Sequence, residues 1–152
     1  MPRSVLVVDE DRDVARGLAA VFDGEGYAAR YALDGLDALR LIRQCPPDLL
    51  VSDAILPGMS GVSLARRLRR SCRTAVILTS DFYADVDLPG VRFVRKPIDP
   101  DELLRVVRRL LGEVGEPSSP LVEITRSRAT GRAGAGNGSP RPRGRPNQTV
   151  YK

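Results

Sequence analysis

The sequence predicts an α/β fold in which a five-stranded parallel β-sheet carries helices on both faces. Short, wholly apolar runs such as Val5–Val8 are typical of strands that are covered on both sides. Segments with helical periodicity alternate with these runs, and short turns connect the two kinds of segment. Strands that alternate with helices in this way favour a parallel sheet.

Each predicted strand is a short apolar segment bounded by turn residues or by a helical pattern. The second is the weakest, because polar residues interrupt it. The third ends at a carboxylate, Asp53, shortly before a Pro–Gly turn. The predicted strands are Val5–Val8, Tyr27–Ala32, Leu49–Ser52, Ala75–Leu78 and Val91–Val94.

Helical patterns follow the first, second, third and fifth strands. The first pattern ends at Gly24 and Gly26, since glycine is favoured just beyond a helix. The second begins at the capping residue Asp34 and stops before Pro46. The last begins at Asp99, with proline next and acids in the first turn. The apolar positions are Val14, Leu18, Val21 and Phe22, then Leu39 and Ile42, then Val62, Ala65 and Leu68, then Leu103, Val106, Val107, Leu110 and Leu111.

The connection between the fourth and fifth strands is short. Only 16 residues lie between Thr79 and Lys96, and they offer no long helical face. We therefore expect the fourth helix of the alternating pattern to be short or missing.

The composition excludes several kinds of site. The chain has 152 residues, 42% of them hydrophobic, which is enough for one domain with a core. It contains no histidine, which excludes histidine acid–base catalysis, Ser–His triads and most zinc sites. Cys45 and Cys72 match no metal or redox spacing and are expected to be free thiols in a reducing compartment. Without a membrane-spanning run or a signal-peptide pattern, a cytoplasmic location is expected.

The character of the chain changes after Gly112. Residues 113–152 are rich in Gly, Pro, Ser and Arg, and they carry +4 of the net charge of +5. Such a segment cannot bury enough apolar surface to fold alone. We predict a folded domain over residues 1–112 and a disordered basic tail over residues 113–152.

Polar residues gather where predicted strands end. Because the carboxyl ends of parallel strands meet at one edge, these side chains are expected to share a crevice. Carboxylates that converge repel one another unless a cation lies among them, and a site of oxygen ligands fits Mg²⁺. An aspartate can attack phosphorus, and a lysine can neutralise the phosphoryl oxygens. All basic residues except Lys96 and Lys152 are arginine. The candidates are Asp9, Glu10, Asp53, Thr79 and Lys96; Asp11 and Asp13 can equally be helix caps.

Four segments, VLVVDED, DLLVSDAILPGMSG, VILTS and FVRKP, resemble the receiver domain of two-component response regulators over residues 3–111. The resemblance implies a flavodoxin-like sheet of order 2-1-3-4-5. It also implies a bacterial phosphoprotein that catalyses only its own phosphorylation and dephosphorylation, with a histidine kinase or a phosphotransfer protein as donor. The implied roles are Mg²⁺ ligands at Asp9, Glu10, Asp53 and the backbone carbonyl of Ile55, phosphoacceptor at Asp53, switch residues at Thr79 and Phe93, and phosphate binding at Lys96.

The sequence departs from the family pattern in several places. Glu10 stands where Asp is usual, and Ile55 and Asp81 occupy positions that tune the lifetime of the phosphoryl group. Phe93 lacks a hydroxyl, so its switch would be ring packing against Thr79. The short connection before Lys96 removes the usual output face, and receivers attached to sensor kinases show a similar contraction. A role in a phosphorelay, or signalling by other protein contacts, is therefore expected.

Two alternatives compete with this interpretation. In the tail, Arg143, Gly144, Arg145 and Pro146 resemble an AT-hook, which lays arginines into the narrow minor groove of A·T-rich DNA. The receiver would then gate a DNA-binding tail, although a merely polyanion-binding or solubilising tail fits the same composition. Separately, Asp9-Glu10-Asp11 is similar to the start of a haloacid dehalogenase-type phosphatase, but Asp13 and the isolated Asp53 disfavour that family.

Overall fold

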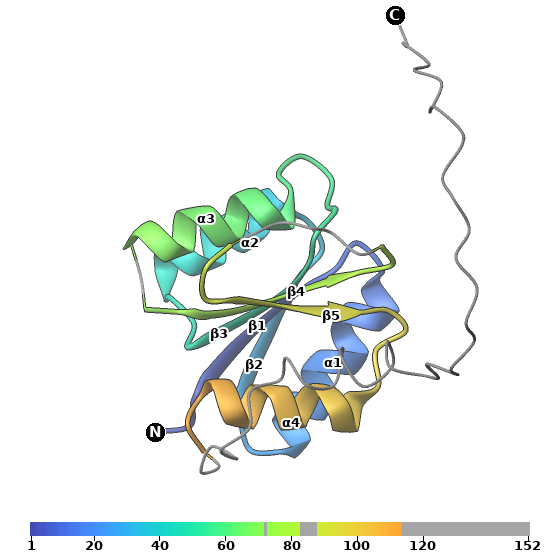
Figure 1. Ribbon diagram of the computed structural model, residues 1–152. Helices are drawn as coiled ribbons and strands as arrows, with labels where there is room; N and C mark the ends of the chain where they lie inside the picture. Colours follow the sequence, from blue (N-terminus) through green and yellow to red (C-terminus); the bar gives the residue numbers. More distant parts are fainter. Residues whose placement is uncertain (72, 83–87, 114–152) are drawn as a thin grey trace, which may run out of the picture. The chain divides into compact units, whose positions relative to one another are not determined.

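The computed structural model describes residues 1–71, 73–82 and 88–113, all within the unit Met1–Glu116. Its centre is a sheet of five parallel strands in the order β2-β1-β3-β4-β5 (Figure 1). This confirms the predicted fold class and the strand order that the resemblance implied. The strands are β1 (Ser4–Val8), β2 (Ala28–Ala32), β3 (Leu49–Asp53), β4 (Ala75–Ser80) and β5 (Val91–Arg95).

The described helices begin at capping residues or at glycines. Asp11 caps the first helix by accepting from the backbone N–H groups of Asp13 and Val14, so the interpretation of Asp11 as a cap is confirmed. Asp34 and Asp99 cap the second and last helices in the same way. The helices are α1 (Arg12–Gly24), α2 (Gly35–Gln44), α3 (Gly61–Ser71) and α4 (Pro100–Leu110).

The helices cover the sheet in two layers, with α1 and α4 on one face and α2 and α3 on the other (Figure 1). In β1, Val5 and Val7 enter the core beneath α1 and α4, whereas Leu6 and Val8 enter the core beneath α2 and α3. Because successive side chains of a strand point to opposite faces, a strand buried on both sides must be apolar throughout. This is why the strand signal in the sequence is a continuous apolar run.

The connection from β4 to β5 contains no helix in its described residues, 81–82 and 88–90, in agreement with a short or missing fourth helix. Residues 83–87 lie outside the described residues, as does the predicted tail beyond Glu113. None of the helices in the described part of the chain combines the length and the hydropathy needed to cross a bilayer.

The register brings the carboxyl ends of the strands to one edge. Val8 pairs with Ser52, Asp53 pairs with Thr79, and Ser80 pairs with Arg95. The residues that follow these positions therefore emerge together, which places the predicted crevice at this edge.

Candidate functional site

Asp53 is held at the end of the central strand β3. The four residues before it are buried on both sides of the sheet, so the backbone that carries Asp53 cannot move independently of the core. The backbone N–H of Ile55 donates to Oδ1 of Asp53 at 3.0 Å, which leaves Oδ2 directed elsewhere. The Asp53 side chain is 14% exposed, so it is largely enclosed but still reaches solvent.

Asp9 follows β1, the neighbouring strand, and is only 3% exposed. Its Oδ1 accepts from the backbone N–H of Asp11 at 2.9 Å, and its own N–H donates to the carbonyl of Ala32. Burying a carboxylate is unfavourable unless hydrogen bonds and a cation accompany it. The hydrogen bond from the backbone N–H of Asp11 stabilises the Asp9 carboxylate only in part, because it provides no cation.

The required cation is Lys96, which follows β5. Its Nζ donates to Oδ2 of Asp53 at 2.9 Å and to Oδ2 of Asp9 at 3.0 Å. Its backbone N–H donates to the carbonyl of Ser80, and the Lys96–Pro97 peptide bond is cis. Burial alone would lower the pKa of Lys96, but the hydrogen bonds and charges of Asp53 and Asp9 outweigh it and raise the pKa. Lys96 is therefore protonated at neutral pH.

The structure also places the other predicted site residues, Thr79, Phe93 and Glu10. Thr79 is buried and is the register partner of Asp53. Phe93 pairs with Leu78, not with Thr79, and packs against the core beneath α2 and α3. Glu10 is exposed and makes no hydrogen bond or ion pair with any described residue. The switch roles of Thr79 and Phe93 stay predictions.

The fit to Mg²⁺ rests on two carboxylates. Among the described residues, no group of three or more His, Cys, Asp or Glu side chains is arranged to hold a metal ion. Glu10 as a metal ligand beside Asp9 and Asp53 therefore stays a prediction. Mg²⁺ keeps several waters and is commonly bound by one or two carboxylates. The ammonium of Lys96, which contacts both Asp9 and Asp53, shows that these two carboxylates lie close enough to share a cation. The donor set therefore fits Mg²⁺, while the carbonyl of Ile55 as a ligand stays a prediction.

Comparison with known proteins decides the family. A model of the response regulator receiver domain matches residues 5–108. The chain belongs to this family. The DNA-binding response regulator MtrA of Mycolicibacterium paratuberculosis is 34% identical over 128 residues, which cover 80% of this chain and 57% of that protein. The chain thus spans little more than half the length of these curated relatives.

Solved receiver domains show the same architecture. The Francisella response regulator 1452 receiver domain is 30% identical and superposes with a TM-score of 0.65 over 73% of this chain and 98% of that one. The receiver domain of the hybrid histidine kinase CckA is 31% identical, with a TM-score of 0.63 over 71% and 98% of the two chains. This family match leaves no support for the phosphatase alternative.

Two glycines of this receiver domain support the site and were missed by the sequence analysis. A Cβ on Gly61, the first residue of α3, would overlap the backbone carbonyl of Asp53. A Cβ on Gly35, the first residue of α2, would overlap the carbonyl of Met59 in the β3–α3 loop. Both helices therefore begin in close contact with β3 or the loop that follows it. Glycine at the start of a helix is the signal that would have suggested such an approach.

A cleft beside the site was also missed. It has a volume of about 470 Å³ and lies between α1 and the segment that joins β5 to α4, with Lys96 in its wall. Its lining is mostly apolar, and Gly17 of α1 leaves open space there. The lining residues are Asp13, Val14, Gly17, Leu18, Val21, Lys96, Pro97, Ile98 and Pro100. The candidate DNA-binding residues Arg143, Gly144, Arg145 and Pro146 lie outside the described residues.

Proposed function

We propose that this receiver domain accepts a phosphoryl group on Asp53 from a phosphohistidine of a histidine kinase or phosphotransfer protein. The observation that carries the proposal is the placement of Lys96, whose ammonium bridges Asp53 and Asp9 at 2.9 and 3.0 Å. A purely structural acid would not need a second carboxylate and a shared cation beside it. Receiver domains act as phosphoacceptors, which supports the same assignment.

The transfer makes one bond and breaks one bond. Oδ2 of Asp53 attacks phosphorus, the P–N bond to the donor imidazole breaks, and its electron pair returns to the imidazole nitrogen. Lys96 stays protonated and offers its ammonium to the phosphoryl oxygens. Mg²⁺, when bound by Asp9 and Asp53, supplies further positive charge at the same oxygens.

The cleft between α1 and the β5–α4 segment is where we place the donor protein. Lys96 belongs both to the cleft wall and to the carboxylate cluster, so an occupant of the cleft lies next to Asp53. The apolar lining, with Val14 and Val21 on α1 and Ile98 opposite, suits an amphipathic helix of the partner. Such a helix would carry the phosphohistidine towards Oδ2 of Asp53.

The output of this receiver is proposed to be protein contact or relay in the cytoplasm, not catalysis on another substrate. A second candidate, a receiver that gates a DNA-binding tail, is favoured by the basic residues 113–152. The relatives named DNA-binding response regulators support it only indirectly, because the chain spans 57% of the MtrA proteins. Binding of A·T-rich duplex DNA by the full chain, compared with an Arg143→Ala, Arg145→Ala double variant, separates the two candidates.

The test of phosphoryl transfer is labelling with acetyl phosphate, followed by intact mass spectrometry. We expect one added phosphoryl group on the wild type in Mg²⁺, none with EDTA, and none on Asp53→Asn. Asp101→Asn, which changes an exposed acid in the first turn of α4, should be labelled like the wild type. Persistent labelling of Asp53→Asn, or a folded wild type that stays unlabelled in Mg²⁺, would contradict the proposal. The latter result would point to a phosphate-independent interaction module.

A further inference from the structure

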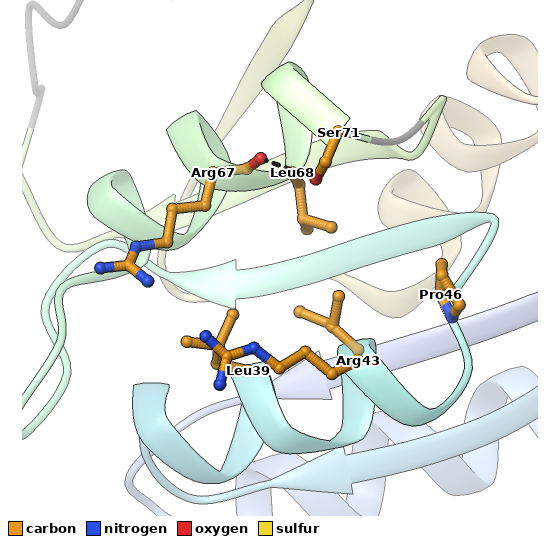
Figure 2. A pocket seen from close by; sticks show the side chains of 7 residues that line it. Leu39, Arg43, Pro46, Arg67, Leu68 and Ser71 are labelled. Carbon is orange, nitrogen blue, oxygen red and sulfur yellow. Dashed lines mark hydrogen bonds between the residues drawn. The ribbon is translucent and has the colours of Figure 1, made fainter.

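A groove between α2 and α3 lies on the face of the sheet opposite to α1 and α4. It has a cavity volume of about 320 Å³, and Figure 2 shows it from close by. Leu39, Ile42 and Leu68 give it an apolar lining, and the last two of these side chains are buried. A cavity of about 150 Å³ is enough to hold a benzene ring, so this groove can accept a bulky apolar side chain. The lining residues are Leu39, Ile42, Arg43, Pro46, Arg67, Leu68 and Ser71.

Two arginines flank this apolar lining, Arg43 from α2 and Arg67 from α3. In Figure 2 both side chains extend along the groove towards the N-terminal ends of their helices, the direction that helical side chains favour. Both residues are exposed, and neither guanidinium makes a hydrogen bond or ion pair with any residue that the structure describes. By contrast, Arg40, one turn before Arg43, is paired with Asp37. The groove therefore presents two cations without partners beside an apolar cavity.

The surrounding charge reinforces this pattern. Helix α3 carries Arg66, Arg67, Arg69 and Arg70 and has no acidic residue. Because these charges are not neutralised along the helix, the groove attracts anions. The basic tail, residues 113–152 with a net charge of +4, is repelled by the same field and is not a suitable occupant. A nucleic acid would meet the exposed arginines but has no apolar side chain to insert between Leu39 and Leu68.

The position of the groove also suits a second partner. The groove is lined by the C-terminal parts of α2 and α3, whereas Gly35 and Gly61, which approach the segment around Asp53, stand at the opposite ends of these helices. The cleft next to Lys96 lies on the other face of the sheet, against α1. An occupant of the α2–α3 groove would thus leave that cleft free.

We propose that the α2–α3 groove binds an acidic amphipathic segment of a partner protein, which inserts one bulky apolar side chain between Leu39 and Leu68 while flanking carboxylates pair with Arg43 and Arg67. The apolar cavity supplies most of the binding energy, and the two arginines supply the preference for acidic segments.

The experiment uses the full chain and three dye-labelled helical peptides, with binding followed by fluorescence anisotropy. The first peptide has Phe or Leu at positions i, i+3, i+4 and i+7 and Glu on its remaining surface. The second keeps Glu and replaces the apolar residues with Ser, so it measures attraction to the basic tail and to surface arginines alone. The third keeps the apolar residues and replaces Glu with Gln. We expect the first peptide to bind about tenfold more tightly than either control.

Charge reversals locate the binding. Arg43→Glu and Arg67→Glu should each weaken the first peptide about tenfold. Arg66→Glu makes the same change of charge on α3 outside the groove and should weaken binding less than about twofold. All three residues are exposed, and acetyl phosphate labelling verifies that each variant is folded. The proposal would be overturned if Arg66→Glu and Arg67→Glu lost equal affinity for the first peptide, or if the Ser peptide bound as tightly as the first. It would also be overturned if duplex DNA displaced the first peptide, or if that peptide did not bind.

Discussion

The Nζ atom of Lys96 lies 2.9 Å from Oδ2 of Asp53, although 43 residues separate the two along the chain. The contact joins the end of β3 to the residue that follows β5, and the same ammonium reaches Asp9 after β1. The cluster is therefore a product of the strand order, because only the parallel arrangement β1-β3-β4-β5 brings these three chain positions to one edge.

Lys96→Met should make the stability of the domain depend strongly on Mg²⁺. Without the ammonium, Asp9 and Asp53 repel each other in a largely buried site, and we expect a loss of about 2 kcal/mol in EDTA. Excess Mg²⁺ should restore much of this loss, because a bound cation stabilises the folded state by mass action. Urea unfolding in EDTA and in Mg²⁺ measures both effects. As a control, Arg95→Met removes an exposed cation next to Lys96, and Mg²⁺ should stabilise this variant no more than the wild type. Equal stabilisation of the two variants by Mg²⁺ would argue against the two-carboxylate site.

Gly17→Trp should block transfer from a protein donor and spare labelling by a small one. Gly17 is in the wall of the cleft beside Lys96, and a side chain added there meets open space, so the variant can fold. The donor for this test is the histidine kinase that phosphorylates the wild type fastest in a panel. We expect the rate of phosphoryl transfer from this kinase to fall at least about tenfold. Acetyl phosphate labelling should be unchanged. Gly24→Trp, also in open space on α1 but outside the cleft, is the matched control. Equal transfer to both variants would place the donor elsewhere.

Gly61→Ala and Gly17→Ala should change stability in opposite directions. A methyl group on Gly61 would overlap the Asp53 carbonyl, and overpacking of this kind costs about 2–3 kcal/mol. Gly17 lies inside α1 with free space around it, so alanine there should stabilise the domain by about 1 kcal/mol. Urea denaturation of both variants measures the difference. If Gly61→Ala is neutral, the close approach of α3 to Asp53 is not required for the fold.

Alkaline pH should destabilise the domain through Tyr27. Burial raises the pKa of the Tyr27 hydroxyl to about 12, and its hydrogen bond to Glu113 adds to the effect, while Arg108 opposes it. The folded state therefore holds this proton more tightly than the unfolded state, whose pKa is 10.0. The contribution of Tyr27 to the free energy of unfolding is fully present below about pH 10 and is lost as the pH rises to about 12. The total loss is about 2–3 kcal/mol.

The Tyr27→Phe variant isolates this contribution. It cannot titrate at position 27, so its free energy of unfolding should fall less than that of the wild type between pH 10 and pH 12. Urea unfolding across this range, with tyrosinate absorbance as a second readout, provides the comparison. Parallel pH profiles for the two proteins would mean that the Tyr27 pKa is not raised in the folded state.

The strands and helices could be predicted because their signals are local. Continuous apolar runs in β1, β3 and β4 report burial on both faces, and Asp11, Asp34 and Asp99 mark helix starts by bonds to their own neighbours. The strand ends, in turn, indicated which polar residues would share an edge. The approaches of Gly61 to Asp53 and of Gly35 to Met59 left only a weak local signal.

By itself, the sequence determined the fold class and the family, and it predicted that Asp9, Asp53 and Lys96 share one edge of the sheet, because hydrophobic periodicity and the motifs around these residues lie in contiguous segments. The tertiary structure alone decided that one ammonium bridges two carboxylates while Glu10 is exposed, that Phe93 lies opposite Leu78, and that Arg43 and Arg67 flank one groove. These relationships depend on strand register and on helix packing between distant segments. Neither can be deduced from a pattern that repeats every two or 3.6 residues.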